Sequence, residues 1–340
     1  MAIQTEITAM FGLQYPILLA PMGGVAGGRL AAAVSNAGGL GLVGGGYADH
    51  AWLRRELDIA AGAAEAPWGV GLIGWCLNED ALDLVLAYRP AAVMLSFGDF
   101  SPWAPAIKAA GARLICQVQD LRGAREARAA GADIVIAQGT EAGGHTGGRA
   151  SLPLIPAVAD AVAPVPTVAA GGIADGRGIA AALMLGAQGV LMGTRFYATH
   201  EALGAGKAKE LIAAASGDAT IRTGVFDSVR DLAWPERYSG RALNNTFAEL
   251  WHGYGDDLRA SMHFERRRYR KATELNDFDT AVVWAGECVD LIERVESASE
   301  LVQRLGQEAE QRLAGASAYC RRAAAQVARL PSRKPQRAQR

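Results

Sequence analysis

The sequence has few cysteines and no long hydrophobic run, and both shortages narrow the functions it can have. Its 340 residues include four cysteines and no CxxC pair, so we expect reduced thiols, no disulfide framework and no bound metal. No apolar stretch approaches the roughly 20 residues of a membrane-spanning helix. The first fourteen residues also lack a basic segment followed by an apolar one. We therefore expect a cytoplasmic protein with no membrane partner.

An excess of charge of either sign is absent too. The formal net charge is −1, which gives no general electrostatic reason to bind nucleic acid. The run Arg266-Arg267-Arg268 lies among aromatic residues and is the one local exception. We interpret it as a solvated helix face or a subunit contact, because the chain as a whole is neutral. The expected partners are small molecules, and a homodimer is left open.

Several familiar catalytic and cofactor motifs are missing as well. The glycine-rich segment at residues 23–28 does not have the GxGxxG spacing that binds a dinucleotide on an open sheet. There is no GxSxG elbow, which argues against a Ser-His-Asp hydrolase. Histidines and carboxylates do not recur at the spacing of metal ligands.

The sequence does contain a regular alternation of short apolar runs and helical stretches. The expected strands cover residues 16–20, 40–43, 68–73, 92–96, 113–117, 133–137, 166–170 and 189–192. Eight short apolar strands, each followed by a helix, predict an α/β fold with a parallel sheet covered on both faces. The count of eight favours a closed (β/α)8 TIM barrel, with its active face at the carboxyl ends of the strands. A doubly wound open sheet is the alternative.

The alternation stops near residue 199, and this change defines the expected domain organisation. We assign residues 1–216 to the barrel, with a helix over 199–216. Residues 217–280 are expected to form an inserted mixed or helical segment after strand eight, which covers the barrel mouth or builds an interface. Residues 281–315 return to helical periodicity and are expected to complete the outer layer. A helical extension and a basic tail occupy 316–340, with a disordered end.

The loop that follows the sixth strand is the candidate reactive centre. Its glycines, Gly143 and Gly144 among them, allow the backbone to approach a ligand closely. His145 follows them and can exchange a proton near neutral pH. We expect its imidazole to lie over a substrate with no bulky neighbour. The alternative is a flexible loop that carries a surface histidine.

The loops after strands seven and eight predict a phosphate site. In a barrel these two loops commonly bind phosphate through backbone N–H groups. Gly171, Gly172 and Gly193 would allow that close approach, and Thr194 adds a hydroxyl donor. Asp175 would repel phosphate, so we interpret it as the N-cap of the next helix. The glycines of either loop, taken alone, are equally consistent with a tight turn.

A ligand anchored on these two loops would extend across the ends of the other strands. It would reach the segment Ala20-Pro21-Met22-Gly23 on one side and His145 on the other. Gln117 and Gln138 end strands five and six, where their amides are expected either to bind a polar ring edge or to satisfy loop backbone.

Five short motifs, taken in order along the chain, resemble the nitronate monooxygenase family, formerly called 2-nitropropane dioxygenases. Residues 234–242 extend the resemblance into the inserted segment, so that it covers the chain to about residue 313. The five motifs are Ala20-Pro21-Met22-Gly23, Ala37-Gly38-Gly39-Leu40-Gly41, Gln138-Gly139-Thr140-Glu141-Ala142-Gly143-Gly144-His145, Ala170-Gly171-Gly172-Ile173-Ala174-Asp175-Gly176 and Met192-Gly193-Thr194-Arg195-Phe196.

The resemblance implies a TIM barrel that holds FMN noncovalently, with the phosphate on the two late loops. It also implies that His145 is the catalytic histidine and that Gln117 faces the flavin. Family members oxidise alkyl nitronates, including propionate 3-nitronate, with molecular oxygen. Many of them carry asparagine near the end of strand three, where this chain has Gly71. The residues expected to bind the cofactor are Ala20, Pro21, Met22, Gly23, Gln117, Gln138, Gly143, Gly144, Gly171, Gly172, Gly193 and Thr194.

Two other functions remain open from the sequence. One is an NAD(P)H-dependent flavin reductase that acts on quinones or on enoyl thioesters, since reductases of the FabK type share the Glu-Ala-Gly-Gly-His motif. One flavin supports both chemistries, and its protein surroundings decide between them. The other is a barrel that binds a phosphorylated ligand without catalysis.

Overall fold

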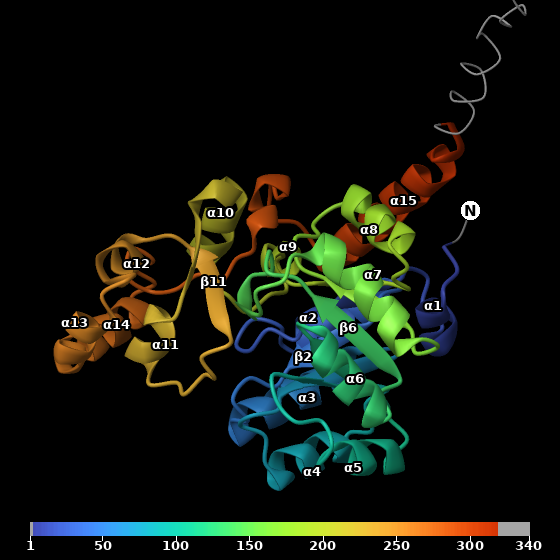
Figure 1. The fold of residues 1–340 in the computed structure, drawn as a ribbon, viewed down its shortest axis with the longest axis horizontal. Helices are drawn as coiled ribbons and strands as arrows, with labels where there is room; N and C mark the ends of the chain where they lie inside the picture. The colour runs from blue at the N-terminus through green and yellow to red at the C-terminus, as the bar shows by residue number, and fades with distance from the viewer. Residues whose placement is uncertain (1–2, 319–340) are drawn as a thin grey trace, which may run out of the picture.

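The computed structural model describes residues 3–318 and is built around a closed barrel of eight parallel strands (Figure 1). The sheet order is β1-β9-β8-β6-β5-β4-β3-β2, and a parallel bridge between Leu18 and Leu40 closes the ring. This confirms the predicted TIM barrel and excludes the open sheet. The strands are β1 (Ile17–Leu19), β2 (Gly41–Gly44), β3 (Trp68–Ile73), β4 (Ala92–Ser96), β5 (Arg113–Val118), β6 (Ile134–Gln138), β8 (Thr167–Ala170) and β9 (Val190–Met192).

The barrel interior is a packed core that is closed at its amino-terminal end. Leu18, Met94 and Ile136 belong to one buried cluster inside the barrel. The short helix α1 (Glu6–Phe11) adds Ile7 and Phe11 to the same cluster. Strands that are buried on both faces appear in the sequence as uninterrupted apolar runs, which explains why all eight were predictable. With one end plugged, the carboxyl ends of the strands are left to form a site.

Helices cover the outside of the barrel. Asp175 accepts a hydrogen bond from the backbone N–H of Gly178 and is the predicted N-cap of α8. The last described helix, α15, packs against α8 and α2 and completes the outer layer. The covering helices are α2 (Gly28–Asn36), α3 (His50–Ala63), α4 (Glu79–Ala87), α5 (Ala104–Ala109), α6 (Leu121–Ala129), α7 (Ser151–Val162), α8 (Gly176–Met184) and α15 (Ala298–Gly315).

Two helical predictions were too long. Residues 199–216 contain only α10 (Gly206–Ala214), after the single turn α9 (Thr194–Tyr197). Residues 281–297 contain no α-helix, only the 3-10 turn η2 (Glu287–Leu291), and the helix starts at Ala298. Both stretches pack against the barrel mouth, so tertiary contacts outweigh their weak helical periodicity. The predicted tail beyond residue 318 lies outside the described residues.

The inserted segment is mixed, as predicted, and it is tied to the barrel by strand pairing. Its strands β10 (Thr220–Thr223) and β11 (Ser239–Leu243) form an antiparallel sheet with β7 (Gly144–Thr146), which belongs to the loop after β6. A separate core, with Phe226 and Phe247 at its centre, holds its helices beside the barrel (Figure 1). These are α11 (Val225–Arg230), α12 (Thr246–Trp251), α13 (Gly255–Ala260) and α14 (Met262–Glu274), after the 3-10 turn η1 (Gly217–Ala219).

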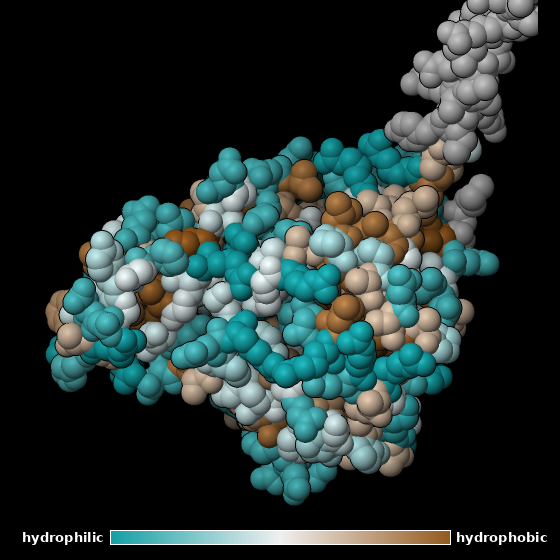
Figure 2. All heavy atoms as spheres, viewed as in Figure 1, coloured by the Kyte–Doolittle hydropathy of each residue, from teal (hydrophilic) through white to brown (hydrophobic). Residues whose placement is uncertain are grey.

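The surface carries no sign of a membrane span. Among residues 3–318, no helix is long and apolar enough to cross a bilayer. The face in Figure 2 is mostly hydrophilic, and its hydrophobic side chains gather mainly over α7 and α8. The basic run on α14 forms local ion pairs, with Arg266 beside Asp231 and Arg268 3.6 Å from Glu265. These pairs fit the predicted solvated helix face.

Candidate active site

A cavity of about 240 Å³ lies at the carboxyl ends of the barrel strands. Every site residue predicted from the sequence lines it: Ala20, Pro21, Met22, Gly23, Gln117, Gln138, Gly143, Gly144, His145, Gly171, Gly172, Gly193 and Thr194. Residues that the sequence did not single out complete the lining, and the inserted segment supplies two of them, Arg230 and Trp234. The cavity therefore lies between the barrel and the inserted segment.

His145 is held at the centre of the short strand β7. Its backbone pairs with Gly240 of β11, where a side chain would collide with the ring of Trp284, 2.3 Å from an added Cβ. The imidazole Nε2 lies 2.8 Å from Oδ2 of Asp227, and both side chains are more than nine-tenths buried. A carboxylate accepts only, so we assign the proton to Nε2. Nδ1, which bonds to no described residue, then carries the lone pair.

Asp227 is a functional candidate that the sequence did not indicate. It lies on α11 of the inserted segment, 82 residues beyond His145. Nothing in its local pattern distinguishes it from an ordinary acidic residue in the first turn of a helix. Only the pairing of β7 with β11 brings α11 over the barrel mouth.

Aromatic rings cover the imidazole, which corrects the expectation that it has no bulky neighbour. Trp234 stacks on His145 with ring centroids 3.5 Å apart and planes 4° apart. The Trp284 ring lies 5.2 Å away. The Trp234 Nε1–H donates to the Tyr47 hydroxyl at 3.0 Å, which fixes the indole across the mouth. The expectation was wrong because glycine neighbours leave space that the inserted segment fills.

The two predicted glutamines have different roles. Gln138 donates to the His145 carbonyl at 3.1 Å and accepts from Gln119 at 2.8 Å and Gln117 at 3.2 Å. Its amide therefore satisfies loop backbone, which was the alternative stated above. Gln117 donates one N–H to Gln138. Its Oε1 bonds to no described residue, so this oxygen can still accept a hydrogen bond from a ring N–H of a ligand.

The two late loops form a backbone cradle. Gly171 and Gly172 have φ angles of 102° and 71°, a left-handed backbone that glycine adopts without strain. The backbone N–H groups of Gly171, Gly172 and Gly193 make no hydrogen bond with another described residue. The Thr194 hydroxyl accepts from the Gly286 N–H at 3.0 Å and also hydrogen-bonds to the Cys288 thiol. Unpaired backbone donors that line one cavity suit a phosphate.

Gly71 lies in the barrel wall and does not line the cavity. A Cβ at this position would be 2.1 Å from the Cγ of Pro21, so the strand can pass this loop only with glycine. Ile73, two residues further along β3, lines the cavity instead. At the cavity the strand therefore presents the apolar side chain of Ile73.

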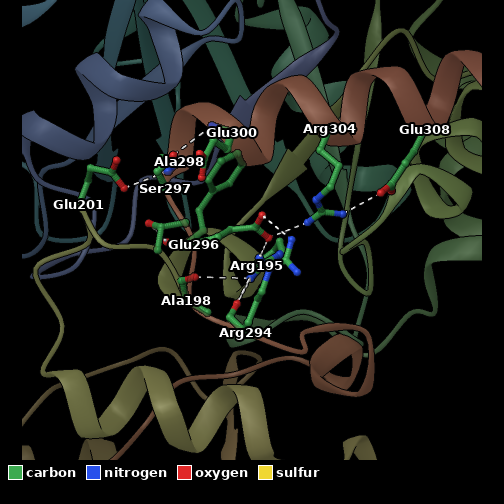
Figure 3. A network of polar contacts seen from close by, with 12 residues as sticks. Arg195, Ala198, Glu201, Arg294, Glu296, Ser297, Ala298, Glu300, Arg304 and Glu308 are labelled. Atoms are coloured by element: carbon green, nitrogen blue, oxygen red, sulfur yellow. Dashed lines mark hydrogen bonds and ion pairs between the residues drawn. The ribbon is translucent and has the colours of Figure 1, made fainter.

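A buried ion-pair network supports the loop after β9 from behind (Figure 3). Arg195 directly follows Thr194, and its side chain is 2% exposed. It pairs with Glu296, which also accepts from Arg304 of α15 at 2.6 Å. Burial raises the pKa of Glu296, but hydrogen bonds and charge from Arg304 and Arg195 outweigh it and leave the pKa below its usual value. The network joins the loop after β9 to the last barrel helix.

Cys288 is the one ionisable thiol in the lining of the cavity. Burial raises its pKa to about 11, so the thiol is protonated at neutral pH. A protonated thiol is a poor nucleophile, which leaves His145 as the group best placed to exchange a proton.

Comparisons with known proteins agree with this arrangement. A family model described as nitronate monooxygenase matches residues 4–76 and 77–308. A nitronate monooxygenase from Neurospora crassa is 34% identical over 89% of this chain and 91% of its own. The structure of FabK from Thermotoga maritima superposes with a TM-score of 0.82 at 30% identity, over 93% of this chain and 99% of FabK.

A second solved structure points the same way. The nitroalkane oxidase from Streptomyces ansochromogenes superposes with a TM-score of 0.76 at 29% identity, over 90% of this chain and 98% of its own. An oxidase and a monooxygenase are oxidoreductases, the class that the sequence predicts for this chain. The family match covers nearly all of the barrel and the inserted segment. The chain is therefore an enzyme that belongs to the nitronate monooxygenase family.

Proposed function

We propose that this enzyme oxidises alkyl nitronates with molecular oxygen through a noncovalent FMN and releases carbonyl products. The observation that carries the proposal is the position of His145. Its Nε2 is held by Asp227, and it lines the same cavity as a cradle of unpaired backbone N–H groups. A proton-transfer group and an anion cradle in one cavity suit a phosphorylated cofactor with a small substrate beside it.

The residues present fit FMN. Gly171, Gly172 and Gly193 would hold its phosphate, with the Thr194 hydroxyl as a further donor. Gln117 would accept from the polar edge of its ring system. When bound, FMN supplies a redox centre that takes electrons from the substrate and passes them to dioxygen. With one cradle in the cavity we expect FMN rather than FAD.

His145 can act in two ways within this proposal. With Nε2–H held by Asp227, the Nδ1 lone pair can remove the α-proton of a neutral nitroalkane. Once protonated, the imidazole can instead donate a hydrogen bond to an oxygen of a nitronate. The stacked Trp234 and the nearby Trp284 exclude water from the ring, which strengthens either interaction.

The second candidate function is an NAD(P)H-dependent flavin reductase, acting on a quinone or an enoyl thioester. The similarity to FabK over nearly the whole chain favours it. The non-enzymatic alternative has no such support, since the named relatives are enzymes.

Steady-state assays distinguish the two activities. FMN-loaded protein in air is mixed with propionate 3-nitronate, and oxygen consumption and nitrite are measured. The same protein is assayed for oxidation of NADH and NADPH with and without a quinone. We expect rapid oxygen consumption with the nitronate and slow oxidation of both nicotinamides. Rapid NAD(P)H oxidation with an inactive nitronate would replace the proposal with the reductase, and protein that never binds FMN would end both.

A further inference from the structure

Arg230 is a cation in the cavity that forms no ion pair with a carboxylate of the described residues. It is the last residue of α11, and it lines the cavity together with His145. Its Nη1 is buried and makes no hydrogen bond, and no carboxylate of a described residue lies within 4.0 Å of its guanidinium. A buried cationic donor without an acceptor is costly and is usually matched by a ligand when it lines a cavity.

The carboxylates nearest to Arg230 in sequence form no ion pair with it. Asp227, one helical turn earlier, accepts from His145 through Oδ2, and its buried Oδ1 has no hydrogen-bond partner. Asp231, the next residue, pairs with Arg266 on the outer surface of the inserted segment. Tyr47 hydrogen-bonds to Arg230 but offers no charge, because burial raises the pKa of its hydroxyl and keeps it neutral. Among the described residues, the guanidinium of Arg230 therefore has no carboxylate within ion-pair distance.

The surroundings of Arg230 fix its orientation. The rings of Tyr47 and Trp284 lie 5.9 Å and 6.0 Å from its Cζ and form apolar walls on two sides. The carboxyl end of α11 favours a positive charge there. A planar guanidinium between aromatic rings presents its N–H groups in a fixed fork, which matches a planar anion with two oxygens.

We propose that Arg230 determines substrate specificity by binding a carboxylate at the end of the substrate remote from the reacting carbon. Asp227 and Arg230 are three residues apart on one helix, a rise of about 4.5 Å. A substrate whose reacting carbon meets His145 would thus place a carboxylate at Arg230 when a short carbon chain joins the two groups. Naming the substrate a nitronate rests on the proposed function, but the carboxylate site does not.

The test uses two nitronates and three variants of the FMN-loaded enzyme. Propionate 3-nitronate carries the carboxylate, and the nitronate of 1-nitropropane has the same carbon count without it. The variants are Arg230→Gln, Arg230→Lys and, as a matched control, Arg237→Gln, an exposed arginine of the same segment that lies over Tyr238. Flavin content and circular dichroism of each variant check that it is folded.

We expect Arg230→Gln to raise the KM for propionate 3-nitronate by about 10- to 100-fold, the effect of losing a charged hydrogen-bonded pair. Its KM for the nitronate of 1-nitropropane should change less than about twofold on the same grounds. The KM of Arg230→Lys for propionate 3-nitronate should lie between those of the wild type and Arg230→Gln. Lysine keeps the positive charge but lacks the paired N–H groups of the guanidinium. Arg237→Gln should match the wild type with both substrates.

Three outcomes would overturn the proposal. Equal increases in KM for both nitronates would mean that Arg230 binds the nitronate group itself. No change with either would deny it an anion-binding role. A loss confined to NADPH would assign it to a dinucleotide phosphate. Should Arg230→Gln fail to fold, Arg230→Lys answers the same question through the ratio of the two KM values.

A binding measurement separates failure of this proposal from failure of the proposed function. Propionate is titrated into the wild-type holoprotein and into Arg230→Gln, and heat and tryptophan fluorescence are recorded, because Trp284 lies beside the site. Binding that is lost in Arg230→Gln would support the carboxylate site even if neither nitronate is oxidised. Equal binding, or none in the wild type, would refute it.

Discussion

At the scale of single residues, the site depends on a pair that the chain brings together from two distant segments. His145 comes from the loop after β6, and Asp227 comes from the inserted segment. The 2.8 Å contact between them fixes which imidazole nitrogen carries the proton. A histidine with a defined tautomer is a better general base than one that rotates freely.

The first prediction concerns the role of His145. As a base it should contribute about 10²- to 10⁴-fold to the rate with a neutral nitroalkane, so His145→Asn should lose that factor. A nitronate is already deprotonated, and the same variant should lose far less with it. Steady-state turnover of nitroethane and of its nitronate measures both, with His252→Asn, an exposed histidine, as the control. Equal losses on the two substrates would contradict the base role and leave electrostatic binding.

The second prediction concerns Asp227. Asp227→Asn keeps the shape of the side chain but can donate to Nε2, which favours the tautomer with the proton on Nδ1. Nitroalkane turnover should therefore fall by about 10-fold to 100-fold, less than for His145→Asn. Asp231→Asn, at the carboxyl end of the same helix but outside the cavity, should have no effect on turnover. If the two aspartate variants behave alike, Asp227 does not orient the histidine.

At the scale of elements, two connections hold the cavity together. The sheet β10-β11-β7 ties the inserted segment to the His145 loop, and α15 ties the loop after β9 to the barrel wall through its ion pair with Glu296. The first connection closes the mouth of the cavity with Trp234, and the second keeps the cradle of backbone N–H groups in place.

The third prediction tests the cradle. Gly172→Asp would place a carboxylate against the FMN phosphate, where repulsion in a confined site amounts to several kcal/mol as an order of magnitude, about 10²-fold or more in Kd. Gly186→Asp is the matched control, because Gly186 is also left-handed, at φ 94°, but lies at the exposed carboxyl end of α8. Equilibrium dialysis measures the Kd for FMN of both variants.

A second cradle variant makes the test independent of backbone strain. Gly193→Asp should also weaken FMN binding, and its position has no left-handed φ angle. Unchanged FMN affinity in both Gly172→Asp and Gly193→Asp would move the phosphate site elsewhere.

The fourth prediction concerns the network behind the cradle. Glu296→Gln leaves Arg195 buried without its countercharge, and breaking such a pair costs about 3 to 5 kcal/mol. The pKa of Glu296 lies below its usual 4.5 in the folded protein, so its stabilisation is present above pH 4.5. It is lost as the pH falls through the lower folded value.

Denaturant unfolding of the wild type and Glu296→Gln across this pH range measures the effect. The difference in unfolding free energy should be full at pH 7 and should shrink as the pH drops below 4.5. Glu293→Gln, an exposed neighbour, is the control. A difference that does not depend on pH would mean that the lost stability is not that of an ionised Glu296.

At the scale of the whole molecule, the barrel was predictable from the sequence, but the way the inserted segment covers its mouth was not. Its eight strands are buried on both faces, so each appears as an apolar run, and most of the runs are followed by glycine within three residues. The carboxyl ends of parallel strands meet on one face, which was enough to bring His145, Gly171 and Gly193 into one cavity. Knowing which strand each loop follows was therefore sufficient to place these residues in the site.

The rest of the site depends on contacts that local pattern does not encode. Arg230 and Trp234 reach the cavity, and Asp227 reaches His145, only because β11 pairs with β7. No hydrophobic periodicity or motif in the sequence predicts that pairing, because β7 is only three residues long and contains a glycine. For the same reason, the irregular stretch 281–297 was mistaken for helix: its packing against α10 outweighs a helical pattern.

The central claim is that the flavin in this barrel takes its electrons from a nitronate. The most direct test is anaerobic rapid mixing of the FMN-loaded enzyme with propionate 3-nitronate or with NADPH, while the visible absorbance of the flavin is recorded. The account predicts that the nitronate bleaches this absorbance faster than NADPH does, and that admitting air restores it. Bleaching by NADPH alone, with no response to the nitronate, would contradict it.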